Sequence, residues 1–285
     1  MSDYPRIAVL GLGIIGSIWA RNWHQDSYPI RSWNRSPKAE SPGWCEDLAE
    51  AVRDADLIAL VLADGPVTRQ IIDAILPHLN AHTIIAQHAT IGVDETKDLA
   101  QRVRSAGHRY LDMPFTGSKP AAEQRQTVFF IGDDDSCFAQ VEAAYSAISN
   151  ARIPLGSVGK AAAIKLAMNL TIAATYQAMA ESLSLARAAG ISDEDYWAVL
   201  DRNVARSGLV DLKRDKMASH DWSPQFSIKH LHKDLDLALR LARDVDRELP
   251  QTHRLCQSYA QRLAAGDGDL DFAAMLRAAD PSNRS

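Results

Sequence analysis

Two polar residues stand one helical turn apart in an alanine-rich stretch of the chain. Lys165 and Asn169 lie in a segment, residues 160–189, whose composition predicts a long helix, so their side chains share one face. Apolar neighbours such as Leu166 would remove water from the lysine and lower its pKa toward neutrality. Such a lysine can donate a proton to a carbonyl oxygen. The alternative is a lysine that extends from the helix into solvent.

Hydroxyl groups and a glycine follow two predicted strands nearer the N-terminus. These residues are Thr90 after the strand at 83–87, and Thr116, Gly117 and Ser118 after the strand at 109–112. Both segments would open at the carboxyl edge of a parallel sheet, where ligands bind in such folds. The hydroxyls and N–H groups of residues 116–118 suit a carboxylate, and a plain glycine turn is the alternative. His88 is more typical of a loop histidine than of a catalyst.

The predicted strand at residues 6–10 runs directly into a glycine-rich turn. Its residues are Gly11, Leu12, Gly13, Ile14, Ile15 and Gly16. In this spacing the first glycine permits a tight turn, the second lets the backbone approach a pyrophosphate, and the third lets the next helix pack closely. Because a strand precedes the turn and an amphipathic segment follows it, we predict a dinucleotide-binding loop and not a purely structural turn.

The second predicted strand, residues 30–33, ends in Asn34, Arg35 and Ser36. This is where a dinucleotide-binding fold contacts the adenosine ribose, usually through an acidic residue when the cofactor is NAD. No Asp or Glu stands here, and a guanidinium suits a 2′-phosphate. We therefore expect NADP as cofactor, with NADPH favoured over NADH. An ordinary solvated Arg35 is the alternative.

Further apolar segments at residues 55–62 and 127–132 also predict strands, and helical segments separate most of them. The expected fold class is α/β, a Rossmann doubly wound parallel sheet over residues 1–157. Beyond Gly159 the chain becomes rich in alanine and leucine. We expect an all-helical domain at residues 158–285, with Gly190 ending its first helix and Ser192 capping the next.

The bulk composition narrows the classes of partner. The chain has 285 residues, a net charge of −5 and a pI near 6.0, which gives no basic surface for nucleic acid or an anionic membrane. The single cysteines Cys45, Cys137 and Cys256 lack metal-ligand spacing, so we expect reduced thiols and no metal. We also expect a cytoplasmic location, because the first strand begins too early to leave room for a leader peptide.

The chain resembles the β-hydroxyacid dehydrogenases, the relatives of 3-hydroxyisobutyrate dehydrogenase, over nearly its whole length. The resemblance rests on the glycine turn and on residues 114–118, 156–169 and 233–235, and within the family it is greatest to the glyoxylate/succinic semialdehyde reductase branch. It implies that Lys165 is the catalytic lysine and that Asn169 helps to hold the substrate. It also implies substrate contacts from Thr90, which lies near the nicotinamide as well, and from Thr116, Gly117, Ser118, Phe226 and Asp234, with Lys233 beside the cofactor.

Three segments depart from the family pattern. Thr116 stands where serine is usual, residues 87–89 replace a segment with an acidic residue and a serine, and Gln124–Arg125 replaces an acidic–glycine pair. The resemblance still implies NADPH-dependent reduction of a small carboxylate-bearing aldehyde to a hydroxy acid, in a homodimer or homotetramer. Two alternatives remain: an imine reductase, and a catalytically silent dinucleotide-binding module that acts through protein contacts. Both would usually lack the lysine.

Overall fold

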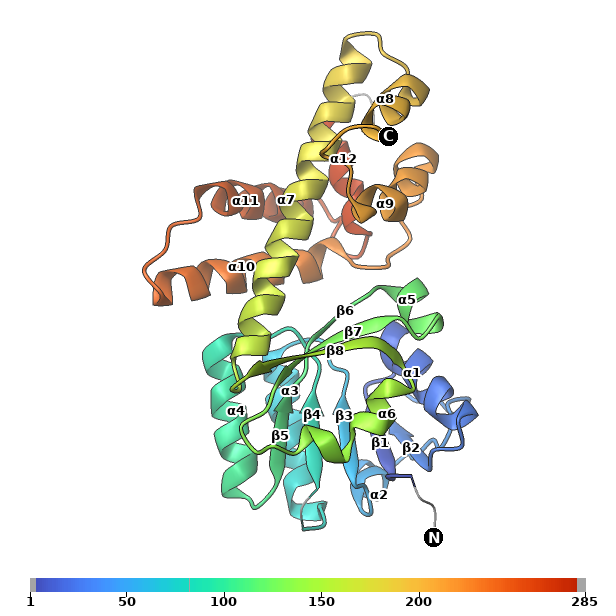
Figure 1. The fold of residues 1–285 in the computed structure, drawn as a ribbon, viewed down its shortest axis with the longest axis vertical. Coiled ribbons are helices and arrows are strands. Elements are labelled where there is room, and N and C mark those ends of the chain that lie inside the picture. Colours follow the sequence, from blue (N-terminus) through green and yellow to red (C-terminus); the bar gives the residue numbers. More distant parts are fainter. Residues whose placement is uncertain (1–3, 82, 281–285) are drawn as a thin grey trace. The chain divides into compact units, whose positions relative to one another are not determined.

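The computed structural model describes residues 4–81 and 83–280. It divides into two compact units, Met1–Lys165 and Leu166–Ser285, and the division falls inside the long helix α7 (Figure 1). The strands of the first unit are β1 (Ile7–Leu10), β2 (Ile30–Trp33), β3 (Leu57–Leu60), β4 (Ile84–Gln87), β5 (Arg109–Asp112), β6 (Phe115–Thr116), β7 (Thr127–Gly132) and β8 (Ser149–Gly156). Its helices are α1 (Ile14–Gln25), α2 (Leu48–Val52), α3 (Gly65–Ile75), α4 (Val93–Ser105), α5 (Lys119–Glu123) and α6 (Glu142–Ser146), with short 3₁₀ turns at Leu76–His78 and Phe138–Gln140.

The described strands form one sheet in the order β2-β1-β3-β4-β5-β7-β6, with β8 on β7. The alternation of side chains along each strand divides the apolar residues between two cores. Ile7 and Val9 of β1 face α1 and α6, whereas Ala8 and Leu10 face α2, α3 and α4. Helices thus cover both faces, which confirms the doubly wound α/β fold.

The sheet is not parallel throughout. The strands from β2 to β5 are parallel, but β7 runs antiparallel to β5 and to β6. Two strands were not predicted from the sequence: β6, which has two residues, and β8, which includes Pro154 and has exposed residues at half of its positions. Neither has the continuous apolar run that indicates a buried strand.

The second unit consists of helices. They are α7 (Lys160–Ala188, which begins in the first unit), α8 (Asp193–Leu200), α9 (Gly208–Ser219), α10 (Ile228–Asp244), α11 (Pro250–Ala264), the 3₁₀ turn η3 (Phe272–Met275) and α12 (Leu276–Ala279). As expected, Gly190 adopts a positive φ of 81° just after α7, and the Ser192 hydroxyl accepts a hydrogen bond from Asp195 N at the start of α8.

A buried ion pair lies in the core of the helical unit. Lys213 Nζ of α9 donates to Asp271 Oδ1 at 2.6 Å, and the side chains are 3% and 0% exposed. Burial lowers the pKa of Lys213, and the carboxylate of Asp271 opposes that shift. The ammonium also lies 4.2 Å from the centroid of the Phe272 ring. These contacts hold η3 against α9.

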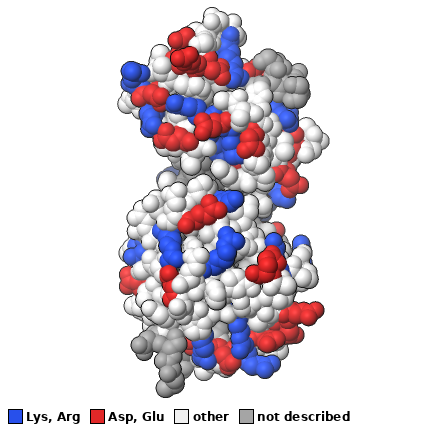
Figure 2. All heavy atoms as spheres, turned by 90° about the vertical axis from the view of Figure 1, so that its right-hand side faces the viewer, with Lys and Arg blue, Asp and Glu red and all other residues white. Residues whose placement is uncertain are grey.

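Acidic and basic side chains are mixed on the face of the molecule drawn in Figure 2. Among the described residues, no helix is both long enough and apolar enough to cross a membrane. Cys45, Cys137 and Cys256, all in the described part, are free thiols.

Removing one partner of the Lys213–Asp271 pair is expected to destabilise the helical unit strongly. The variant Lys213→Met leaves a buried carboxylate without its countercharge, which costs about 3–5 kcal/mol. Urea unfolding of the variant and the parent measures the difference. The matched control is Lys229→Met, which breaks the exposed pair with Asp269 and should leave the urea midpoint close to that of the parent. Equal losses in the two variants would contradict a special role for the buried pair.

Candidate functional site

The last residues of the parallel strands form one row at the carboxyl edge of the sheet. In strand order these in-register partners are Trp33, Leu10, Leu60, Gln87 and Asp112. The glycine turn and the segments that follow β2, β4 and β5 therefore all begin at the same edge. This is where open α/β sheets bind their ligands.

Two of the three glycines in the turn are required by the fold itself. Gly11 has a φ of 101°, and a Cβ there would lie 2.3 Å from Val61 O; a Cβ on Gly16 would lie 2.0 Å from Gly11 O. A Cβ on Gly13, in contrast, would have no atom within 4 Å. Gly13 is the N-cap residue of α1, and no side chain caps the helix there. The space beside Gly13 and the N–H groups of the first turn therefore fit a dinucleotide pyrophosphate. Around it Leu12 is buried, Ile15 half-buried and Ile14 exposed.

The segment after β2 braces the glycine turn. Asn34 Oδ1 accepts a hydrogen bond from Leu12 N at 3.0 Å, and Asn34 Nδ2 donates to Ser36 O at 2.9 Å. The amide of this predicted cofactor residue is thus used within the protein. Arg35 and the Ser36 side chain are exposed beside it. The guanidinium of Arg35 and the hydroxyl of Ser36 are groups that could hydrogen-bond to a ribose phosphate.

Lys165 lies in the second turn of α7 and is half-buried. Its Nζ is 5.9 Å from the centroid of the Phe115 ring, a distance at which the ring face attracts an ammonium by about 0.5–1 kcal/mol. Phe115 directly precedes Thr116. The structure therefore brings the ammonium to the start of the segment predicted to bind a carboxylate.

The fold determines the conformation of that segment. Thr116 pairs with Val128 at the end of β6, and Gly117 has a φ of 113°, where a Cβ would lie only 3.0 Å from Ala121 Cβ. Ser118 caps α5 through its backbone, and its hydroxyl makes no capping bond. Thr116, Gly117 and Ser118 are each half-buried, as is Thr90 after β4.

The helical unit groups three of the predicted residues. Asn169 Nδ2 donates to Asp234 Oδ2 at 2.6 Å, and Lys233 Nζ lies 2.9 Å from Asp234 Oδ1. Asn169 and Asp234 are 1% and 2% exposed. Since a carboxylate can only accept, this bond orients the amide of Asn169 and directs its Oδ1 away from Asp234.

Phe226 is held by backbone contacts to Asp271, a residue that was not predicted from the sequence. Asp271 Oδ2 accepts hydrogen bonds from Gln225 N at 2.8 Å and Phe226 N at 3.1 Å, and the Phe226 ring packs edge-on to Phe272 at 6.0 Å. No local pattern could have indicated this role, because Asp271 is 45 residues farther along the chain than Phe226.

His88 is a structural residue. Its ring is 2% exposed, with Nδ1 2.7 Å from Met113 O and Nε2 2.9 Å from the Tyr145 hydroxyl. The carbonyl can only accept, so Nδ1 carries the proton and Nε2 accepts from Tyr145. Burial lowers the pKa of His88 to about 4, and the ring therefore stays neutral near pH 7.

Arg125 adopts a backbone conformation that glycine favours. Its φ is 59°, in the left-handed region, and its guanidinium pairs with Asp26 and donates to Ala147 O at 3.0 Å. The side-chain contacts offset the backbone strain. The loop after α5 thus holds a left-handed residue in place without a glycine.

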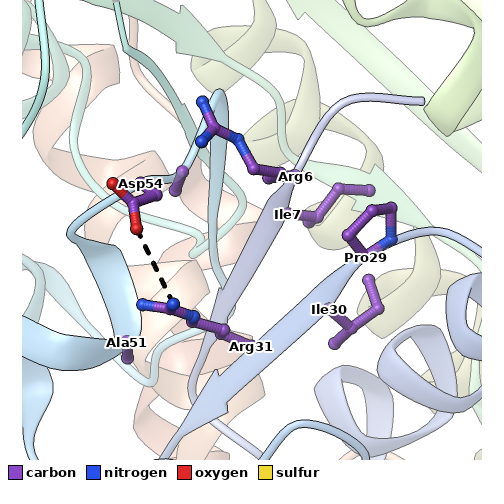
Figure 3. Close-up of a pocket in the computed structure, with 8 residues that line it drawn as sticks. Arg6, Ile7, Pro29, Ile30, Arg31, Ala51 and Asp54 are labelled. Carbon is purple, nitrogen blue, oxygen red and sulfur yellow. Dashed lines mark ion pairs between the residues drawn. The ribbon is translucent and has the colours of Figure 1, made fainter. Parts of the chain in front are cut away.

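A surface pocket of about 230 Å³ lies at the opposite edge of the sheet. Arg6, Pro29, Arg31 and Asp54 line it near the starts of β1 and β2, and Arg31 pairs with Asp54 at 3.7 Å (Figure 3). It holds none of the predicted site residues. Among residues 4–81 and 83–280, no group of three metal-ligating side chains comes together.

Comparisons with known proteins identify the family of the chain. Residues 6–164 match the family described as the NAD binding domain of 6-phosphogluconate dehydrogenase, and residues 159–279 match that described as the NAD-binding domain of NADP-dependent 3-hydroxyisobutyrate dehydrogenase. The solved structure of Mycobacterium tuberculosis 3-hydroxyisobutyrate dehydrogenase with L-serine has a TM-score of 0.87 at 25% identity, over 96% of this chain and 99% of that one. The fold and the glycine turn define a dinucleotide-binding oxidoreductase. The chain belongs to the β-hydroxyacid dehydrogenase family, whose members depend on NAD(P).

The chain is also similar to proteins with other names. Glyoxylate/succinic semialdehyde reductase 1 of Arabidopsis thaliana is 24% identical over 95% of this chain and 97% of its own length. The cytokine-like nuclear factor N-PAC of Mus musculus is 25% identical over 96% of this chain, but the chain spans only 50% of that protein. An imine reductase from Pseudomonas sp. has the same fold, with a TM-score of 0.64 at 24% identity over 97% of this chain and 99% of that one.

The open space at Gly13 leads to a test of the cofactor loop. Gly13→Ala should leave the melting temperature within about 2 °C of the parent, yet weaken NADPH binding about tenfold or more, because the new methyl occupies the space that a pyrophosphate needs. Gly16→Ala should instead lose about 1–3 kcal/mol of stability through overpacking. Thermal melting and NADPH fluorescence titration measure the two effects. Normal NADPH affinity in Gly13→Ala would contradict the assignment.

Proposed function

We propose that the protein uses NADPH to reduce a small carboxylate-bearing aldehyde, of the glyoxylate or succinic semialdehyde type, to the hydroxy acid. The observation that carries the proposal is the contact between Lys165 Nζ and the Phe115 ring, because Phe115 adjoins the carboxylate-binding segment. The names of the Arabidopsis reductase and of the 3-hydroxyisobutyrate dehydrogenase support this substrate class.

In this mechanism each residue has a defined task. When bound, NADPH supplies the hydride. The segment of Thr116, Gly117 and Ser118 binds the substrate carboxylate and so fixes the direction of the carbonyl group. Lys165 Nζ donates a proton to the carbonyl oxygen as the alkoxide develops. Asn169, whose amide Asp234 orients, accepts from the lysine through Oδ1 or donates to a substrate oxygen through its second Nδ2 hydrogen.

The remaining predicted residues bind and enclose the reactants. Thr90 lies near both nicotinamide and substrate, Phe226 forms a wall of the pocket, and Lys233 contacts the cofactor.

We further propose a cytoplasmic homodimer or homotetramer that associates through the alanine-rich α7, with residues 158–285 as the substrate and dimerisation domain. The partner is a small molecule and not nucleic acid or a membrane.

Two other functions have some support. The likeness in fold to an imine reductase favours reduction of a C=N bond, and the likeness to half of a nuclear factor favours a silent binding module. Lys165 argues against both, because the resemblance implies that proteins with these two functions usually lack the lysine. An assay of NADPH oxidation with glyoxylate, succinic semialdehyde, tartronate semialdehyde, methylmalonate semialdehyde and cyclic imines separates the three functions.

Lys165→Met tests the proton donor with the aldehyde that this assay identifies. The variant keeps the length of the side chain but cannot donate a proton, so kcat should fall about 10²- to 10⁴-fold while the Kd for NADPH stays within about threefold. Lys160→Met, at an exposed position of the same helix, is the matched control and should keep the parent rate. Near-normal turnover of Lys165→Met with cofactor bound would overturn the mechanism.

Arg35→Ser tests the preference for NADPH. Loss of the guanidinium should raise KM for NADPH about 10- to 100-fold, because this factor corresponds to the free energy of a charge-assisted hydrogen bond. KM for NADH should change less than about threefold. Arg53→Ser, which removes the same charge at the exposed end of α2, should change neither value. Parallel loss of affinity for both cofactors would rule out recognition of the 2′-phosphate by Arg35.

A further inference from the structure

Asp112 is a buried carboxylate that joins the end of β5 to the beginning of α7. Its Oδ2 accepts hydrogen bonds from Gly159 N at 2.9 Å and from Ala162 N at 3.0 Å, and the residue is 1% exposed. Gly132 of β7, its antiparallel partner, leaves room for it: a Cβ there would lie 3.2 Å from the carboxylate. The neighbouring strand and the helix N-terminus thus form a fitted site for this one side chain.

The position of Asp112 along the chain connects two parts of the proposed mechanism. Ala162 is three residues before Lys165, about 4.5 Å along the helix axis. On the other side, Asp112 is four residues before Thr116, at the start of the carboxylate-binding segment. One carboxylate therefore sets the position of the helix that carries the proton donor relative to the strand that leads to the substrate anchor.

A simple helix cap would not need these properties. An exposed serine or asparagine caps a helix without the cost of burying a charge, which is several kcal/mol. Here burial raises the pKa of Asp112 to about 6, although the backbone N–H groups oppose the shift. Two N–H groups from the beginning of α7 converge on the single Oδ2, so one buried oxygen fixes this turn of the helix relative to β5. This arrangement serves the placement of α7 more than its stability.

We propose that Asp112 is a positioning residue, which holds the first turn of α7 so that Lys165 Nζ stays within reach of a carbonyl group anchored at residues 116–118. The proposal rests on the proposed function. It predicts that loss of the two hydrogen bonds slows the chemical step and leaves the binding of cofactor and substrate intact. A shift of the proton donor by about 1 Å is enough to lower a rate about 10²-fold.

The test compares kinetic constants of full-length variants. Asp112→Ala should lower kcat about 10- to 100-fold, with KM for the aldehyde and Kd for NADPH within about threefold, and should increase the solvent isotope effect on kcat because proton transfer becomes slower. Asp112→Asn keeps an acceptor for the two N–H groups and should restore kcat to within about fivefold of the parent. The matched control is Asp134→Ala: Asp134 accepts from Val158 N at 3.1 Å beside the same helix end, but its carboxylate is solvent-accessible.

Several outcomes would overturn the proposal. They are a kcat of Asp112→Ala within twofold of the parent, a loss confined to KM, an unchanged solvent isotope effect, and a failure of Asp112→Asn to restore the rate. If Asp112→Ala does not fold, Asp112→Glu takes its place, since the extra methylene displaces the carboxylate; unchanged kcat there also overturns the proposal. If Lys165→Met is inactive while Asp112→Ala is not, only the positioning role fails, whereas an active Lys165→Met refutes the proposed function itself.

Discussion

The geometry of the candidate site depends on hydrogen bonds from the N-terminal turn of α7 to a single buried carboxylate. Asp112 cannot be satisfied by water at 1% exposure, so its Oδ2 relies on the N–H groups of Gly159 and Ala162. Those N–H groups are donors that no turn of the helix itself can satisfy. The carboxylate and the two N–H groups thus satisfy one another, and the two hydrogen bonds form only when β5 and α7 are both in place.

In the helical unit, too, a buried aspartate accepts hydrogen bonds from the backbone of a distant segment. Asp271, also buried, accepts hydrogen bonds from Gln225 and Phe226 while Lys213 neutralises its charge. In both units a buried aspartate connects distant parts of the chain and holds a segment that carries a predicted site residue. The difference is the countercharge: Asp271 has a lysine, whereas Asp112 has backbone N–H groups, and burial raises the pKa of Asp112 as a result.

Local patterns explain which parts of this structure could be predicted. The apolar runs at β1, β3 and β4 are continuous because both faces of these strands are buried, and the glycine spacing reflects close contacts at Gly11 and Gly16. The boundary between α7 and α8 was predictable because Gly190 and Ser192 act on adjacent residues. The edge strand β8 was not, since exposed strands lack that pattern, and the roles of Asp112 and Asp271 depend on contacts that no local window contains.

Asn34, which the sequence predicts to lie in the cofactor site, also makes contacts within the protein. Its amide bridges Leu12 N and Ser36 O. This bridge ties the glycine turn to the segment that carries Arg35, so that neither can move without the other. A side chain that stiffens the binding loop lowers the entropy that is lost when a ligand orders it. In the proposed function, the exposed side chains beside this bridge recognise the adenosine end, and the bridge keeps them close to the turn proposed to bind the pyrophosphate.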